Sequence, residues 1–351
     1  MSLQQHLATD KKYMSRCIQL AKSGMGYVAP NPMVGALLVY GYKVIGEGFH
    51  KKYGEPHAEV NCIMSVNAEN KSLIEKSTMY VSLEPCSHYG KTPPCADLIL
   101  ESKINRVVIG CKDVNEKVSG RGIKKLQEAR VNVVSGILEE ECVELNKRFF
   151  TFHQKKRPYI LLKWAQTADR KIGSENEKRV LISNEYSNRL VHKWRSEEAA
   201  IMVGTHTAIK DNPSLTTRLW RGKNPVRIVI DKDLKLPSTL NLFDSESNTI
   251  VINTIKDSSE KHIRYIKIDD GNFLEKMLMR LYESEIQSIL VEGGANTLQS
   301  FIDACLWDEA RIITNEKMTF GQGIDSPKLK GGIMIYEQEF ENDRICFYSN
   351  T

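Results

Sequence analysis

The stretch between residues 56 and 95 limits what this chain can fold into more than any other, because it places metal-binding residue types at fixed spacing. It contains the segments His57-Ala58-Glu59 and Glu84-Pro85-Cys86, followed by Cys95. One imidazole and two thiolates are a ligand set for a tetrahedral zinc ion whose fourth position is open. Zinc lowers the pKa of a water molecule in that position to about 7. We therefore expect His57, Cys86 and Cys95 to bind Zn²⁺.

Glu59 lies two residues after the histidine and is not needed as a ligand. A carboxylate beside the metal can take a proton from water and pass it to a leaving amine. H-x-E followed by P-C-x-x-C is typical of zinc deaminases, so we predict that Glu59 is catalytic. Here eight residues, not two, separate Cys86 from Cys95. A structural zinc site or two unrelated cysteines are the alternatives, although a structural site normally has a fourth Cys or His ligand.

Local patterns place these residues at the ends of regular elements. Apolar spacing after His57 predicts a helix that holds His57 and Glu59 in its first turn. Residues 78–83 are rich in β-formers and predict a strand that ends just before Cys86. Cys95 opens a further helix, and a helix N-terminus favours the thiolate that zinc requires.

The length of 351 residues suggests two domains, and 41% hydrophobic and 26% charged residues are ordinary for a globular protein. A net charge of +5 suits a small anionic substrate and predicts no nucleic-acid partner. The polar N-terminal residues lead us to expect no secretory signal, and the lack of a run of 18 apolar residues leads us to expect no membrane association. The eight cysteines are scattered, which favours the reducing cytosol over a disulfide framework.

The first half alternates helices and strands. A helix capped by Thr9 precedes a strand at 34–40 with a hairpin partner at 43–48. Strands at 106–110 and 131–134 flank a helix at 123–129, and a further helix follows from 138, which predicts an α/β sandwich. Asn31, at the mouth of the first strand, either shapes a turn or reads a base edge, and His50 is equally ambiguous. His88 and Lys91 could clamp an anion near the metal or be solvated loop charges.

Residues 153–158 are basic, polar and end in a proline, as a linker would, so we predict domains at 1–152 and 153–351. Strands at 159–165, 200–204, 226–231, 249–253, 263–268 and 288–291 alternate with helices at 185–198, 273–282 and 295–306. This alternation predicts a mostly parallel sheet. Asn184 is the expected cap of the first of these helices.

Some second-half residues have chemistry that allows more than one interpretation. Gly293-Gly294, at a strand-to-helix turn, either lets a phosphate approach the backbone or only turns tightly. Asp211 opens a polar loop that is a turn or the wall of a site. Arg195 and Arg218 either bind phosphate or are structural. No G-x-G-x-x-G follows a strand, which disfavours a Rossmann cofactor site.

The motifs of the first half, with Asn31-Pro32 and Val34-Gly35, resemble the deaminase half of the bifunctional deaminase–reductases of riboflavin biosynthesis. The eight-residue cysteine spacing is that family's own. The resemblance implies a cytidine-deaminase-like α/β/α sandwich that removes an amine from a diamino-pyrimidinone ribosyl phosphate. It also implies that the substrate is held by Asn31, His50, His88 and Lys91.

The second half resembles the same family's reductase half, through Lys163-x-Ala165, Arg195, residues 204–207, residues 211–218 and Glu292-Gly293-Gly294. The resemblance implies a fold similar to dihydrofolate reductase, with NADPH reducing the ribosyl group to ribityl. The implied cofactor-binding residues are Ala165, Leu181, Thr207, Asp211, Gly293 and Gly294. The implied substrate-binding residues are Arg179, Arg195, Leu215, Arg218 and Glu292. Lys163 and Asp211 are the candidates for polarising or protonating the sugar.

Two positions depart from the family pattern. Arg170 stands where a glycine is common, and a bulky residue there should disfavour a positive φ. Arg179 stands where a small serine is usual. A deaminase with an inactive reductase domain is therefore one alternative. A nucleic-acid-editing deaminase and a non-enzymatic protein with structural zinc are the others. We also expect a homo-oligomer.

Overall fold

The computed structural model describes residues 3–89, 93–115, 119–174, 180–269 and 271–350. The chain forms two compact units, Met1–Lys155 and Lys156–Thr351. The predicted boundary after residue 152 falls inside helix α6 (Lys147–Lys155). The helix continues past that point, with the His153 ring packed against Phe149 at 4.4 Å between ring centroids, so the first half of the expected linker is helical.

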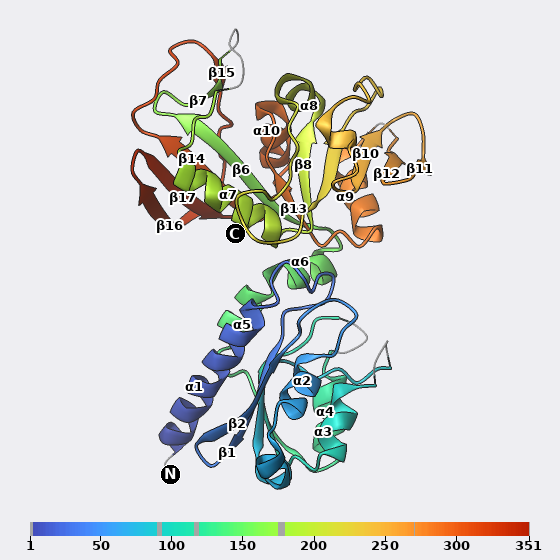
Figure 1. Cartoon of the computed structure of the whole chain (residues 1–351), viewed down its shortest axis with the longest axis vertical. Helices are drawn as coiled ribbons and strands as arrows, with labels where there is room; N and C mark the ends of the chain where they lie inside the picture. Colours follow the sequence, from blue (N-terminus) through green and yellow to red (C-terminus); the bar gives the residue numbers. More distant parts are fainter. Residues whose placement is uncertain (1–2, 90–92, 116–118, 175–179, 270, 351) are drawn as a thin grey trace. The chain divides into compact units, whose positions relative to one another are not determined.

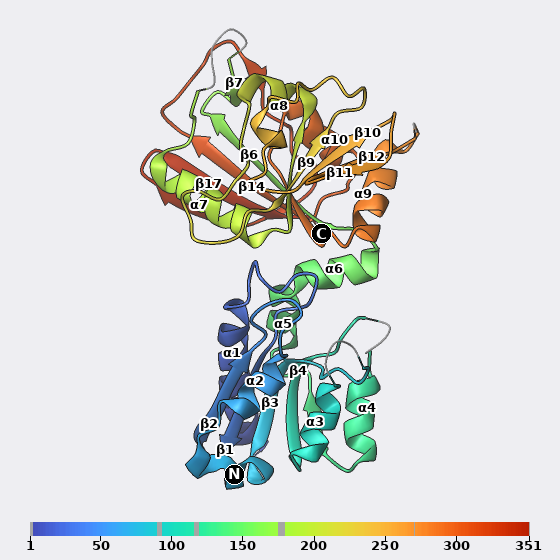
Figure 2. The ribbon, with the colours of Figure 1, turned by 45° about the vertical axis from the view of Figure 1, so that its right-hand side comes forward.

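The first unit is built on a five-stranded sheet in the order β2-β1-β3-β4-β5, and the first four of these strands are labelled in Figure 2. Its strands are β1 (Gly35–Tyr40), β2 (Lys43–Phe49), β3 (Thr78–Leu83), β4 (Arg106–Cys111) and β5 (Asn132–Ser135). The expected hairpin is confirmed, because β1 pairs antiparallel with β2. β1 also pairs antiparallel with β3, whereas β3, β4 and β5 run parallel.

Helices cover both faces of this sheet, as the sandwich prediction required (Figures 1 and 2). Alternate residues of β1 enter the two cores: Leu37 packs with α1 (Leu3–Lys22) and α5 (Glu139–Leu145). Leu38 packs with α2 (Ala58–Met64), α3 (Cys95–Glu101) and α4 (Arg121–Glu128). A 3₁₀ helix, η1 (Ala68–Lys76), joins α2 to β3.

Two predicted helix ends in this unit are wrong. Helix α1 begins at Leu3, and Thr9 lies inside it, where its hydroxyl donates to the carbonyl of Gln5 at 2.8 Å instead of capping. The stretch predicted as one helix from residue 138 divides into α5 and α6. Asn146 lies between them, and its amide exchanges hydrogen bonds with the backbone N–H and C=O of Met33 at 2.8 and 2.9 Å.

The second unit contains a ten-stranded sheet in the order β11-β12-β10-β9-β8-β13-β6-β14-β17-β16. Its bounds are β6 (Tyr159–Thr167), β8 (Ala200–Gly204), β9 (Val226–Ile230), β10 (Thr249–Asn253), β11 (Ser258–Glu260), β12 (Ile263–Lys267), β13 (Ser288–Val291), β14 (Glu309–Asn315), β16 (Ile333–Phe340) and β17 (Asp343–Ser349). From β12 to β14 neighbouring strands are parallel, which confirms the mostly parallel sheet. A separate pair joins β7 (Lys171–Gly173) to β15 (Ile324–Asp325).

Helices again cover both faces. The core that holds residues of α9 (Phe273–Glu283) and α10 (Ala295–Asp303) lies on one face. The core that holds residues of α7 (Glu185–Glu197) and α8 (Thr205–Asp211) lies on the other, next to the 3₁₀ helix η2 (Asn241–Phe243). The Asn184 cap is confirmed, because its side chain accepts from Ser187 N at 2.9 Å. None of the helices in the described ranges is both long and apolar enough to cross a membrane.

Candidate functional site

The three predicted metal-binding residues of the first unit lie together. Their ligand atoms are all within 4.8 Å of one another, with His57 just before α2 and Cys95 at the start of α3. His57 Nδ1 lies 3.6 Å from Cys86 Sγ and 3.4 Å from Cys95 Sγ. Tetrahedral zinc with ordinary bond lengths separates a bound nitrogen from a bound sulfur by about 3.6 Å. The donor set and its spacing therefore fit zinc.

Glu59 adjoins this cluster on the first turn of α2 and is only 4% exposed. Burial raises the pKa of its carboxyl, and the nearby Cys86 thiolate raises it further. A carboxyl that holds a proton more readily is better suited to carry one between water and a leaving group. Hydrogen bonding with Cys95 lowers the pKa of the Cys86 thiol, which favours a thiolate ligand.

Asn31 and His50 lie beside the metal cluster and contact each other. The His50 ring packs edge-on against His57, with 5.3 Å between ring centroids. His50 Nδ1 lies 3.1 Å from the carbonyl of Pro56, which can only accept, so Nδ1 carries the proton. Nε2 then accepts from the Asn31 amide at 3.1 Å. Burial lowers the pKa of His50, in keeping with this neutral form.

Sequence reasoning missed the part that Glu84 plays in this site. Its buried carboxylate accepts from the backbone N–H groups of Asp113, Gly120, Gly122 and Ile123, at 3.2, 3.0, 2.9 and 3.2 Å. This ties the segment before Cys86 to the N-terminus of α4. An acid immediately before Pro85-Cys86 was the only signal, and its partners lie 29 to 39 positions away. Of the two predicted anion-binding residues, His88 is exposed and Lys91 lies outside the described residues.

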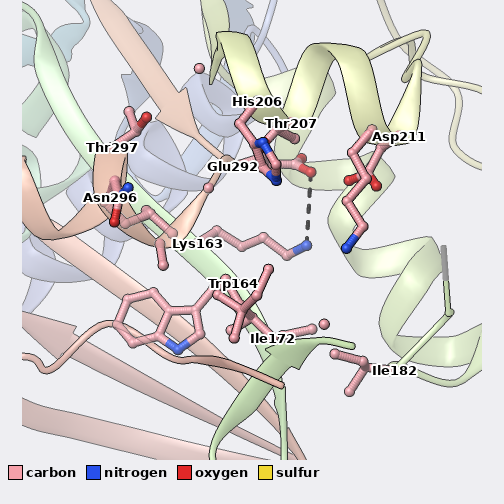
Figure 3. Close-up of a pocket in the computed structure, with 18 of the residues that line it drawn as sticks. Lys163, Trp164, Ile172, Ile182, His206, Thr207, Asp211, Glu292, Asn296 and Thr297 are labelled. Atoms are coloured by element: carbon pink, nitrogen blue, oxygen red, sulfur yellow. Dashed lines mark ion pairs between the residues drawn. The ribbon is translucent and has the colours of Figure 1, made fainter. Parts of the chain in front are cut away.

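The second unit contains a cavity of about 920 Å³ at the carboxyl ends of its parallel strands (Figure 3). Ligands bind at this edge in open α/β sheets. The predicted residues that line it are Lys163, Ala165, Leu181, Arg195, Thr207, Asp211, Arg218, Glu292 and Gly294. Thr207 and Asp211 both belong to α8, a helix that the sequence reasoning took for a turn and a loop.

Two predicted residues of this unit that the structure describes are not on the cavity wall. Gly293 does not line it, and a Cβ at that position would lie 2.8 Å from the Val203 side chain, so its small size serves packing. Leu215 is buried at 3% exposure in the core beneath α7 and α8. Arg179 lies outside the described residues.

A network of charges forms one wall of the cavity. Arg195 donates to Glu292 through Nε at 2.7 Å and Nη2 at 2.8 Å. Lys163 Nζ lies 3.8 Å from the same carboxylate (Figure 3). Burial alone would raise the pKa of Glu292, but Arg195 and Lys163 lower it to about 2. Glu292 is therefore ionised at neutral pH and holds both cations at the wall.

His192, on α7, also lines the cavity and was not predicted. Its Nδ1 accepts from the backbone N–H of Arg218 at 2.9 Å, so the ring fixes the segment that carries this arginine. Burial and then Arg195 lower the pKa of His192 to about 4, which keeps Nδ1 free to accept at neutral pH. Its position on α7, a turn before Arg195, was the available signal.

Comparison with known proteins accounts for both sites. A family model described as the cytidine and deoxycytidylate deaminase zinc-binding region matches residues 7–111. A second, described as the RibD C-terminal domain, matches residues 158–330. The riboflavin biosynthesis protein RibD of Aquifex aeolicus is 39% identical over 339 residues, which cover 95% of this chain and 93% of that protein. The chain belongs to the RibD family.

Other RibD proteins agree with this assignment. The RibD of Bacillus amyloliquefaciens is 40% identical over 310 residues, covering 86% of this chain and 82% of that protein. The crystal structure of the diaminohydroxyphosphoribosylaminopyrimidine deaminase/5-amino-6-(5-phosphoribosylamino)uracil reductase of Thermotoga maritima superposes with a TM-score of 0.90 and 36% identity, covering 99% of this chain and 100% of that one. This RibD family member therefore has both the deaminase domain and the reductase domain, and the expected cofactors, Zn²⁺ and NADPH, are those of the family.

The cavity of the reductase domain fits a dinucleotide. Gly294 has φ 52°, and it precedes α10, whose first N–H groups can face a phosphate. A Cβ at Gly294 would lie 3.1 Å from the Thr207 hydroxyl, and one at Gly204 would lie 2.6 Å from that of Thr297. Bare backbone at these two positions leaves the hydroxyls of α8 and α10 accessible, as a pyrophosphate-binding turn requires.

The expectation about Arg170 was wrong. Arg170 adopts φ 59°, the conformation that a side chain was expected to prevent. The turn imposes it: Arg170 N donates to the carbonyl of Thr167, and Ser326 N donates to that of Arg170, both at 2.9 Å. Asp169 accepts from Phe320 N at 3.2 Å and Gly321 N at 2.8 Å. The turn therefore keeps the shape a glycine would give it, at a cost of about 1–2 kcal/mol.

Proposed function

We propose that this chain catalyses two consecutive steps of riboflavin biosynthesis at two separate sites. The deaminase domain, Met1–Lys155, acts on 2,5-diamino-6-ribosylamino-4(3H)-pyrimidinone 5′-phosphate, and the reductase domain, Lys156–Thr351, reduces the ribosyl group of the product to ribityl. The observation that carries the proposal is the His57, Cys86 and Cys95 cluster with buried Glu59 beside it, since a carboxylate in that position can carry a proton from water to a leaving amine.

In the first step, zinc bound to the cluster supplies a Lewis acid that makes water nucleophilic at neutral pH. Glu59 takes a proton from that water and delivers it to the ring nitrogen of the substrate. A second transfer protonates the departing amine, which leaves as ammonia, and the ring carbon gains the oxygen. His50, neutral and held by Pro56, orients Asn31, whose amide oxygen is left to accept from the pyrimidine. His88 and Lys91 are assigned to the substrate phosphate.

For the second step, NADPH bound in this cavity would be the source of the hydride that reduces the ribosyl C1′, and the ring oxygen released as the sugar opens needs a proton. Lys163 is assigned the role of protonating the ring oxygen, because its ammonium group faces the cavity and is held by Glu292. Asp211, on α8, lines the same cavity and is assigned to the cofactor and the sugar. Arg195 and Arg218 bind the phosphorylated substrate, with Arg179 assigned to the same side.

The reductase domain also presents a surface suited to a second copy of this chain. Strand β16 is the last strand of its sheet, and Ile333, Met334, Ile335 and Tyr336 are each 47–62% exposed. An exposed apolar edge strand is a template for pairing with another chain. We infer a homo-oligomer that pairs through β16. Sedimentation of Ile335→Lys as a smaller species than the parent protein supports this, and a parent protein that sediments as a monomer at micromolar concentration contradicts it.

Eight free cysteines favour a reducing compartment, the cytosol, as the site of this activity. A deaminase with an inactive reductase domain remains the competing function, suggested by the residues at positions 170 and 179. The intact Arg195, Glu292 and Lys163 network favours an active reductase.

The test is a coupled assay on purified, zinc-loaded protein supplied with the diamino-pyrimidinone ribosyl phosphate and NADPH. We expect ammonia release followed by loss of NADPH absorbance in equal amounts. Ammonia without NADPH oxidation would establish the competing function, and neither signal would reject the proposed substrate.

A further inference from the structure

The cavity of the reductase domain runs across several neighbouring strands, and this fixes how a dinucleotide can lie in it. It is lined from β6, by Lys163 and Ala165, to the residues that follow β9, including Lys232 and Lys235. These strands are separated by β13 and β8. Three steps of about 4.8 Å span roughly 14 Å, a length that an extended dinucleotide bridges. Gly294, which follows β13, lies between the two ends.

The chemistry of the two ends differs. The β6 end holds the Lys163, Glu292 and Arg195 network, and so receives the reacting sugar and the hydride-donating ring. The opposite end, after β9, is therefore left for the adenosine half of the cofactor. NADPH differs from NADH only there, by a phosphate on the 2′-oxygen of the ribose.

An acid at the end of a strand is how many dinucleotide sites bind the ribose hydroxyls of NAD. Asp231 occupies such a position after β9, but it is only 3% exposed. One of its oxygens accepts from Lys235 N and the other from Leu236 N, both at 3.0 Å. Asp231 also lines the cavity, but both of its oxygens already accept from this turn, so its carboxylate serves to shape the turn.

The same turn presents lysines to the cavity. The carbonyl of Lys232 accepts from both N and Oγ1 of Thr254 at 3.0 Å, so its backbone is fixed, and Nζ lies 4.3 Å from the centre of the Phe273 ring. Lys235 pairs with Asp233 at 2.7 Å, with both side chains well exposed. An exposed pair of this kind contributes little, so Lys235 can exchange it for a more highly charged phosphate.

We propose that Lys232 and Lys235 bind the 2′-phosphate of the cofactor and so make the reductase domain select NADPH over NADH. The inference rests on the proposed function only in that the cavity holds a nicotinamide dinucleotide. Asp231 shapes the turn that holds the two ammonium groups in place. The 2′-phosphate, with a charge near −2, can interact with both ammonium groups. NADH has no phosphate at this position and makes neither interaction.

A phosphate monoester could also come from the substrate, and the ligands chosen for the test separate the two sources. Calorimetry on full-length, zinc-loaded protein would measure binding of 2′,5′-ADP, 5′-AMP and the deaminated ribosyl phosphate. The variants are Lys232→Gln, Lys235→Gln and the double variant. The control is Lys267→Gln, which removes an exposed lysine of β12 that does not line the cavity.

We expect the double variant to bind 2′,5′-ADP about tenfold more weakly or worse, the change that about 1.4 kcal/mol produces. Binding of 5′-AMP should change by less than about twofold, and Lys267→Gln should match the parent protein. The preference for 2′,5′-ADP over 5′-AMP should also fall as salt is raised.

Unchanged 2′,5′-ADP binding in the double variant would overturn the inference while leaving the cofactor itself intact. Weakened binding of the ribosyl phosphate with 2′,5′-ADP unaffected would overturn it in favour of a substrate subsite. Failure of the parent protein to bind NADP⁺ or 2′,5′-ADP would instead reject the proposed cofactor site, and this inference with it.

Discussion

Arg195 and Glu292 form a two-pronged ion pair on the wall of the reductase cavity, with Nε–Oε1 and Nη2–Oε2 separations of 2.7 and 2.8 Å. Arg195 comes from α7 and Glu292 follows β13, so the pair joins elements that lie 97 positions apart. Paired N–H···O bonds of this kind fix orientation as well as charge. Both side chains are at least nine-tenths buried. The pair therefore stabilises the folded domain and also fixes the orientation of the charged groups on the cavity wall.

This pair gives the domain a specific dependence on pH. The pKa of Glu292 lies at about 2 in the folded chain, against an ordinary 4.5. Its stabilising contribution is therefore complete above about pH 4.5 and is lost as the pH falls towards 2. In the parent protein, the free energy of unfolding measured with urea should fall as the pH is lowered from 5 to 3. The whole contribution of the ionised Glu292 carboxylate to that free energy is on the order of 3 kcal/mol.

Glu292→Gln should be less stable at pH 7 and should lose that part of the pH dependence. Glu339→Gln, which removes an exposed carboxylate of β16, is the matched control and should keep it. An equally steep pH dependence in the Glu292 variant would contradict the assignment.

His192 should act on substrate affinity and not on the chemical step. Its Nδ1 holds the backbone of Arg218 at 2.9 Å, so His192→Ala should raise the KM for the deaminated intermediate by about tenfold, with kcat nearly unchanged. The pKa of about 4 means that the parent KM should be constant from pH 6 to 8 and should rise as acid protonates Nδ1. His192→Asn, whose side-chain oxygen can accept, should recover part of the loss. A fall in kcat alone would refute this role.

The left-handed backbone of Arg170 predicts a gain from glycine. Arg170→Gly should raise the free energy of unfolding by up to about 1 kcal/mol, because glycine has no Cβ to make the φ of 59° unfavourable. Arg170→Ala keeps the Cβ and should give no such gain. Denaturant unfolding of the three proteins measures the difference. Destabilisation by glycine greater than that by alanine would mean that Arg170 makes contacts that outweigh the strain.

Metal removal should separate the two activities. The metal cluster lies wholly in the first compact unit and the dinucleotide cavity wholly in the second. Incubation with a chelator should stop ammonia release, whereas NADPH oxidation with the deaminated intermediate should continue, and added Zn²⁺ should restore the first activity. A parallel loss of both activities would argue against independent sites.

The sequence predicted those features that depend on neighbouring residues. His57, Glu59 and Cys95 lie at helix starts that local patterns specify, and β3 begins and ends where predicted. Features set by distant partners were missed. The role of Glu84 depends on N–H groups 29 to 39 positions away, and the role of His192 depends on Arg218. Nor did any local pattern distinguish Gly294, which lines the cavity, from Gly293, which packs against Val203.

The elements after residue 306 show the same limit. β14 joins the parallel sheet beside β6, and β17 and β16 extend it antiparallel, yet sequence reasoning named none of them. Apolar and charged residues mix along these strands: Glu309 and Arg311 are buried because they pair with each other at 2.7 Å. The alternation of apolar and polar residues that predicts a strand is lost when the buried face of that strand carries an ion pair. Likewise, the turn that holds Arg170 at a positive φ depends in part on a hydrogen bond from Ser326, far along the chain.

Glu59 and Glu292 serve two different reactions, and a paired assay of Glu59→Gln and Glu292→Gln tests this separation. Each zinc-loaded variant would receive the diamino-pyrimidinone ribosyl phosphate in one cuvette and the deaminated intermediate with NADPH in another. We predict that Glu59→Gln retains zinc and oxidises NADPH but releases no ammonia. We predict that Glu292→Gln releases ammonia but does not oxidise NADPH. Ammonia release by Glu59→Gln at the parent rate, or loss of both activities in either folded variant, would contradict the account.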